Sequence, residues 1–170
     1  MQNRYIITTS LIKNKGYTQG NVSDDVITTS LRRVQDGSLE PILGTTFFKR
    51  LLDGVEAGDL NTDETALIDN YIAAYLVARV DYKIVPHLAF EIRSKTVGQS
   101  SDQYIETATD ANMIRLRDEL KKDAETYEHR LIGYLKDNCD LFPEYKNFIC
   151  NFENIKPEQD QTPDLPISFL

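Results

Sequence analysis

The chain has 170 residues, 41% apolar and 27% charged, a balance typical of one compact domain with a hydrophobic core and not of a disordered chain. Its net charge of −8 has the wrong sign for a protein that binds by neutralising phosphates, which disfavours sequence-specific nucleic-acid recognition. No apolar run approaches the roughly 18 residues that span a bilayer, and the start Met1–Tyr5 lacks the apolar stretch of a signal peptide, so we expect a cytosolic product with no membrane partner.

Residues 1–22 are predicted to form an extended lead. The stretch Tyr5–Thr9 is β-prone but has no obvious hairpin partner, Ser10 can cap a short turn, and Gly16 and Gly20 mark a loop.

Two helices are predicted next. The first begins after Ser23, and Gly37 and Pro41 should loosen or end it. The second begins at Thr45 and stops at Gly58.

A longer third helix begins at a capping box formed by Asn61 and Glu64. Its broad apolar face implies burial on more than one side. Pro86 should kink it, and the apolar residues that follow favour a continuation to Ile92.

The strongest helical periodicity runs from Asp110 to about Asn138 and places Leu120 in the core. Residues 94–109 form a polar connection before it. We therefore expect an all-α bundle of about four helices over residues 23–150. The proline-rich, acidic segment 151–170 should form an extended C-terminal arm.

No catalytic, cofactor-binding or metal-binding pattern stands out. Glu125 and His129 lie one helical turn apart and are possible metal ligands, but nothing supplies a third ligand, so a charged surface pair is the simpler interpretation. The alternating charges of the last long helix predict ion pairs such as Asp118–Lys122 and Lys121–Glu125. Cys139 and Cys150 are too few for a disulfide framework. We expect no enzyme, no cofactor and no metal site.

The aromatic and apolar residues outside this pattern suggest an interface. Tyr71, Tyr75 and Tyr82 can pack in the core or serve a subunit contact. The apolar residues near the C-terminus have no local helix to pack on, so they dock on their own domain or, as we favour, on another chain. The candidate interface residues are Leu165, Ile167, Phe169, Leu170, Tyr71, Tyr75 and Tyr82.

Several short segments carry a resemblance when taken in order. They are Asn21-Val22 before an acidic helix start, Gln35-Asp36, Pro41-Ile42-Leu43-Gly44-Thr45, the long helix with its Pro86 break, and Leu141-Phe142-Pro143-Glu144-Tyr145. Their order and spacing over residues 21–145 resemble the head–tail connector (adaptor, or neck ring) proteins of tailed bacteriophages, most of all those of crAss-like phages that infect Bacteroides.

The resemblance implies a virion structural protein made in the bacterial host cytoplasm. Its subunits would form a twelve-fold homo-oligomeric ring that docks below the portal protein and contacts other neck or tail rings. DNA would pass through this ring without specific binding, which suits an acidic protein. The alternative is a cytosolic helical regulator or antitoxin-like protein-binding module.

Overall fold

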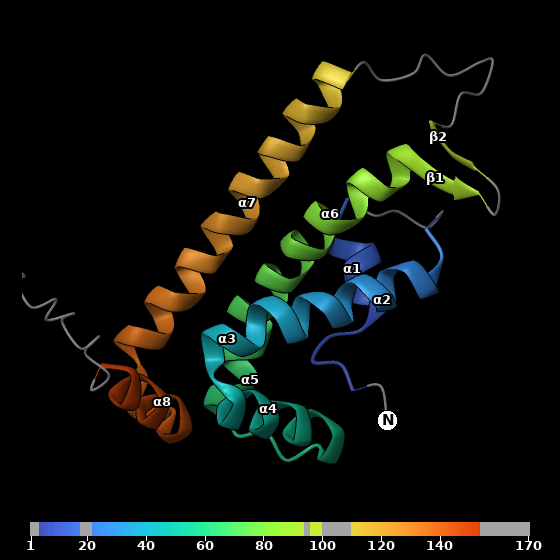
Figure 1. Ribbon diagram of the computed structural model, residues 1–170. Helices are drawn as coiled ribbons and strands as arrows, with labels where there is room; N and C mark the ends of the chain where they lie inside the picture. Colours follow the sequence, from blue (N-terminus) through green and yellow to red (C-terminus); the bar gives the residue numbers. More distant parts are fainter. Residues whose placement is uncertain (1–3, 18–21, 94–95, 100–109, 154–170) are drawn as a thin grey trace, which may run out of the picture.

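Helices make up nearly all of the computed structural model, which describes residues 4–17, 22–93, 96–99 and 110–153 (Figure 1). The all-α fold class is confirmed, and one short hairpin joins two of the helices. In chain order the elements are α1 (Thr9–Lys15), α2 (Asp24–Val34), η1 (Gln35–Leu39), α3 (Glu40–Leu43), α4 (Thr45–Ala57), α5 (Thr62–Leu67), η2 (Ile68–Ile72), α6 (Ala73–Ala89), β1 (Phe90–Arg93), β2 (Thr96–Gln99), α7 (Asp110–Asp137), η3 (Cys139–Leu141) and α8 (Pro143–Glu153).

The helix that begins after Ser23 continues through a wider π-helical turn, η1, into α3. Gly37 lies in this turn, so it loosens the helix and does not end it, and Pro41 is accommodated in the first turn of α3. The helix ends at Gly44, whose φ of 77° and ψ of 149° belong to a region open mainly to glycine. Helix α4 begins directly after it and ends at Gly58, as predicted, in the left-handed conformation.

The predicted capping box is present. The Asn61 side chain accepts a hydrogen bond from the Glu64 backbone N–H at 2.7 Å, and the Glu64 carboxylate accepts one from the Asn61 N–H at 2.9 Å. Glu64 is buried and also accepts hydrogen bonds from Arg50 of α4, at 3.0 Å from Nε and 2.9 Å from Nη2. The cap therefore fixes the start of α5 and ties it to α4.

The prediction of an extended lead outside the bundle is wrong for the described residues 4–17. Ile6, Ile7 and Ile12 belong to the main hydrophobic core, and residues 9–15 form α1, capped by Thr8. The buried Gln35 amide holds this segment, since its Oε1 accepts from the Ile6 N–H at 2.8 Å and its Nε2 donates to the Arg4 carbonyl at 3.3 Å. A buried amide needs such partners, which explains why the N-terminal backbone is held there.

The third long helix also differs from prediction near its C-terminal end. It continues past Pro86 but stops at Ala89, and Phe90 to Arg93 form β1, antiparallel to β2 with Phe90 opposite Gln99. The signal was present, because apolar Phe90 and Ile92 alternate with charged Glu91 and Arg93, a period of two that favours a strand. Part of the predicted polar connection, residues 96–99, is the second strand of this hairpin.

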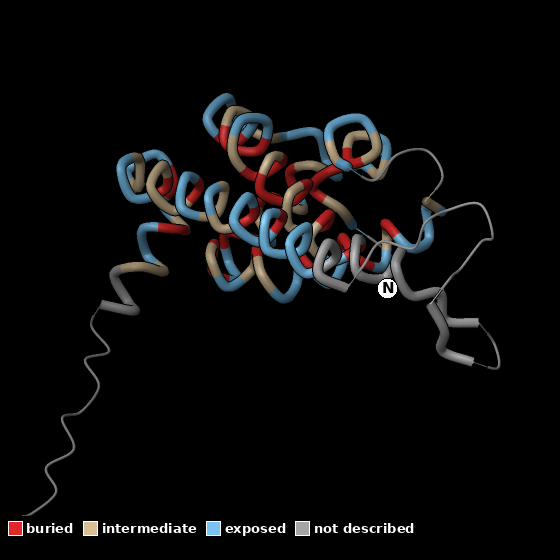
Figure 2. Tube along the Cα trace, turned by 90° about the horizontal axis from the view of Figure 1, so that it is seen from above, coloured by how far each residue is buried: buried red, intermediate tan, exposed pale blue. Residues whose placement is uncertain are grey.

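Helix α7 runs from Asp110 to Asp137, close to its predicted end, and packs along α6 (Figure 1). The chain then turns through η3 into α8, which continues to Glu153 and so past the predicted domain boundary at residue 150. Figure 2 shows that buried residues lie where helices face one another and exposed residues on the outer sides. In the described part of the chain no helix is long and apolar enough to cross a membrane.

Two sequence segments that carry the resemblance meet in space. Phe47 of α4 lies 5.3 Å from Phe142 and 6.3 Å from Tyr145, between ring centres. A Cβ placed on Gly44 would lie 2.5 Å from the Phe148 ring of α8, so the glycine lets α8 approach the α3–α4 junction closely. Residues about 40–48 and 142–148 therefore form one packed corner.

Leu120 lies on the buried face of α7, with 3% of its surface exposed, as predicted. Leu120→Ala should lower the free energy of unfolding by about 2–5 kcal/mol, because burial is lost and a cavity remains. The matched control is Leu116→Ala, one turn earlier and 39% exposed, which should cost far less. Urea denaturation of both variants tests this, and equal midpoints would show that the buried face of α7 is assigned wrongly.

Candidate interaction surfaces

The three tyrosines predicted at an interface have different positions. Tyr71, in η2, is partly buried and stacks on Tyr134 of α7, with ring centres 4.0 Å apart and an angle of 18° between the planes. This stack joins η2 to α7 within the subunit. Tyr71 therefore contributes to packing within the subunit.

The prediction of Tyr75 at a subunit interface is wrong, because none of its surface is exposed. α6 is covered by α2 on one side and by α7 on another, and Tyr75 is enclosed between them. The buried Tyr75 hydroxyl makes no hydrogen bond of good geometry. Burial raises the pKa of Tyr75 to about 12, the Glu128 charge adds to the rise, and Arg79 and Ser38 partly oppose it.

The raised pKa of Tyr75 gives a pH prediction. The ordinary tyrosine pKa of 10.0 applies to the unfolded chain, so the folded state favours the neutral phenol, and this stabilisation is complete below pH 10 and lost as pH rises toward 12. Two pKa units correspond to about 2–3 kcal/mol. Tyr75→Phe should therefore lose less stability than the wild type between pH 10 and 12, measured by urea denaturation. Tyr17→Phe, at a side chain 71% exposed, is the control and should behave like the wild type.

Tyr82 lies near arginine side chains from two helices. It is partly exposed on α6, and the guanidinium carbons of Arg79 and Arg117 lie 5.8 Å and 5.9 Å from its ring centre. Arg117 comes from α7, so two helices bring two cations to one ring. This arrangement was not evident from the sequence, because Arg117 and Tyr82 are 35 positions apart.

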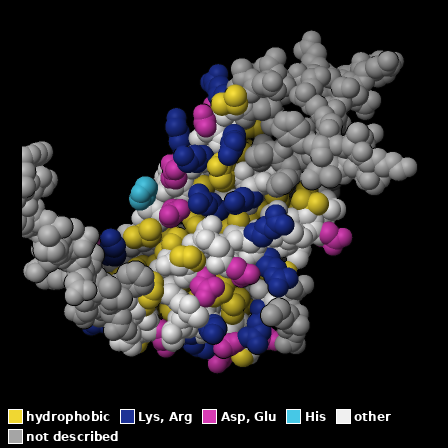
Figure 3. All heavy atoms as spheres, viewed as in Figure 1, with side chains coloured by type: hydrophobic (Ala, Val, Ile, Leu, Met, Phe, Trp, Pro, Cys, Tyr) yellow, Lys and Arg dark blue, Asp and Glu magenta, His cyan; other side chains and the backbone are white. Residues whose placement is uncertain are grey.

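The N-terminal turns of α7 extend from the body. Every residue from Ile114 to Glu119 is exposed, and Ile114 has 61% of its surface exposed. Lys and Arg side chains gather along this half of α7 and on the neighbouring helices (Figure 3). This surface of the chain therefore carries charges of both signs together with exposed apolar side chains.

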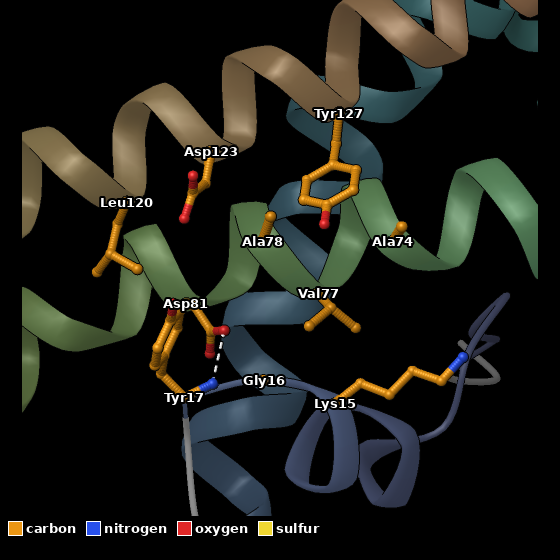
Figure 4. Close-up of a pocket in the computed structure, with 10 residues that line it drawn as sticks. All are labelled: Lys15, Gly16, Tyr17, Ala74, Val77, Ala78, Asp81, Leu120, Asp123 and Tyr127. Atoms are coloured by element: carbon orange, nitrogen blue, oxygen red, sulfur yellow. Dashed lines mark hydrogen bonds between the residues drawn. The ribbon is translucent and has the colours of Figure 1, made fainter.

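A pocket of about 540 Å³ lies between the end of α1, α6 and α7 (Figure 4). The small side chains of Ala74 and Ala78 on α6 leave room for the pocket. Asp123 and Tyr127 point toward the pocket from α7. The buried Asp81 carboxylate accepts a hydrogen bond from the Tyr17 N–H at 2.8 Å. The ten lining residues include two carboxylates, Asp81 and Asp123, and the amine of Lys15, but no serine, cysteine or histidine.

The possible metal pair lies on the surface. Glu125 is 3.6 Å from Lys121 in the predicted ion pair, and His129 is exposed. Within the described residues no group of three or more histidine, cysteine or acidic side chains is placed to hold a metal ion. The predicted Asp118–Lys122 pair is not formed, and Arg115 pairs with Glu119 at 3.2 Å instead.

The remaining predicted interface residues, Leu165, Ile167, Phe169 and Leu170, lie outside the described residues. Their role stays a prediction.

Comparison with known proteins identifies a family and no function. No curated protein and no solved structure matches the chain. A family described only as one of unknown function, DUF6712, matches residues 39–153, about two thirds of the chain. The match contains the packed corner between α4 and α8, the Tyr71 stack and the two helices that carry Tyr82 and Arg117. On this match the chain belongs to the DUF6712 family.

Proposed function

We propose that this protein is a ring-forming head–tail connector subunit of a tailed bacteriophage, a virion protein that docks below the portal and extends the DNA channel to the tail. The observation that carries the proposal is the ordered set of segments over residues 21–145 that resembles such connectors.

Two of these segments, residues 41–45 and 141–145, belong to the packed corner between α4 and α8, where Phe47 contacts both Phe142 and Tyr145. The residues that carry the resemblance therefore pack together in one structural unit. A packing role of this kind fits a non-catalytic assembly protein.

The shape of the subunit also supports the proposal. A ring subunit needs a rigid body and surfaces for its neighbours. α6 and α7 pack along each other, and the exposed turns of α7 around Ile114 give a surface beyond that pair. Net acidity suits a channel through which DNA passes without being held.

The test is electron microscopy of the purified full chain, alone and mixed with the portal protein of the same phage. We expect closed rings that stack on the portal, with twelve-fold symmetry. A chain that stays monomeric or dimeric and does not bind portal rings would contradict the proposal and favour the alternative, a cytosolic helical regulator or antitoxin-like module.

A further inference from the structure

Arginine and lysine side chains form a cationic surface on α6 and α7. It consists of Arg79, Tyr82 and Lys83 of α6 with Ile114 and Arg117 of α7. In the described part of the chain Arg79, Lys83 and Arg117 form no ion pair, whereas Arg115 and Lys121, also on α7, pair with Glu119 and Glu125.

The arrangement of these cations favours an acidic ligand. Arg79 and Arg117 approach the same Tyr82 ring, and Arg79 and Lys83 are one helical turn apart, so like charges repel one another. A carboxylate placed between them would relieve this repulsion and form charge-assisted hydrogen bonds. The Tyr82 ring and the exposed Ile114 side chain add apolar contact area. The surface therefore suits a segment that carries both carboxylates and apolar side chains.

The chain contains one such segment outside the described residues. Residues 154–170 carry three acidic residues, Glu158, Asp160 and Asp164, against one Lys, and they contain the apolar residues Leu165, Ile167, Phe169 and Leu170. We propose that residues 154–170 of one copy bind the cationic surface of a second copy. This inference rests on the proposed ring and names the contact between its neighbouring subunits.

Between two copies, this contact would join different parts of the subunit. The described chain ends at Glu153 in α8, which follows the C-terminal end of α7, whereas Arg117 lies 20 residues earlier in α7, about 30 Å along the helix. Seventeen residues reach at most about 60 Å when extended, so the tail is long enough to reach this surface. The donor and acceptor sites are thus different parts of the subunit, and a contact between different parts closes into a ring when its rotation permits.

The experiment exchanges the charges of the two partners in the full chain. The surface variant is Lys83→Glu with Arg117→Glu, both exposed positions, and the tail variant is Asp160→Lys with Asp164→Lys. Self-association is measured by sedimentation velocity at low salt. Each variant alone should associate at least about tenfold more weakly than the wild type, since like charges then face each other. An equal mixture of the two should recover association, because each tail then meets an opposite surface on the other variant.

The matched control is Lys122→Glu with Lys136→Glu, which changes the net charge by the same amount at exposed positions outside the cationic surface. It should associate like the wild type, and thermal melting should show all variants folded. Unchanged association of the surface or tail variant would overturn the inference, while rings of wild type on the portal would leave the proposed function in place. If the mixture did not recover association but a chain with all four changes did, the tail would bind the cationic surface of its own copy. That result would also overturn the inference. A wild type that does not self-associate overturns it as well.

Discussion

Gly44→Ala should lower the free energy of unfolding by about 2–5 kcal/mol. The backbone at Gly44 has a φ of 77°, where an L side chain is strained, and the new Cβ would lie 2.5 Å from the Phe148 ring. Both costs arise at the junction of α3 and α4, against which α8 packs. Urea denaturation followed by circular dichroism measures the change.

A double-mutant cycle separates the two costs of Gly44→Ala. Combined with Phe148→Ala, the substitution should cost less than in the wild-type background because the collision is removed, while the backbone strain remains. Gly37→Ala is the control, since no atom lies within 4 Å of its Cβ position, and it should be neutral or slightly stabilising. If Gly44→Ala were as mild as Gly37→Ala, the close approach of α8 to this junction would be wrong.

Phe142→Ala should cost about 3–5 kcal/mol, the range for a large aromatic residue removed from a core. Only 1% of Phe142 is exposed, and its ring lies 5.3 Å from Phe47 and 6.4 Å from Tyr134. It therefore joins the end of α7 and the start of α8 to α4. Differential scanning calorimetry should show a lower melting temperature for this variant.

The neighbouring Leu141 provides the matched control for Phe142. Leu141 is 44% exposed, so Leu141→Ala removes little buried surface and should have a small effect. Equal losses for the two variants would mean that the turn before α8 does not pack as described. The packed corner contains part of the connector resemblance. The Phe142 result therefore also tests whether those residues stabilise the fold by packing.

Local signals in the sequence determined several helix ends. The capping box at Asn61 and Glu64, the stop at Gly58 and the end of α7 depend on residues within one turn of one another, so each could be predicted without knowing what packs nearby. The periodicity of α7 likewise placed Leu120 on its buried face.

Tertiary structure decided what those helices cover and which residues meet. The N-terminal segment is held by the Gln35 amide, and Tyr75 is buried because α2 and α7 both cover α6. The approach of Arg117 to Tyr82, and the corner between α4 and α8, join residues far apart in the chain. A helical pattern shows that one face is apolar, but burial and charge pairing depend on the neighbouring element, which only the folded chain supplies.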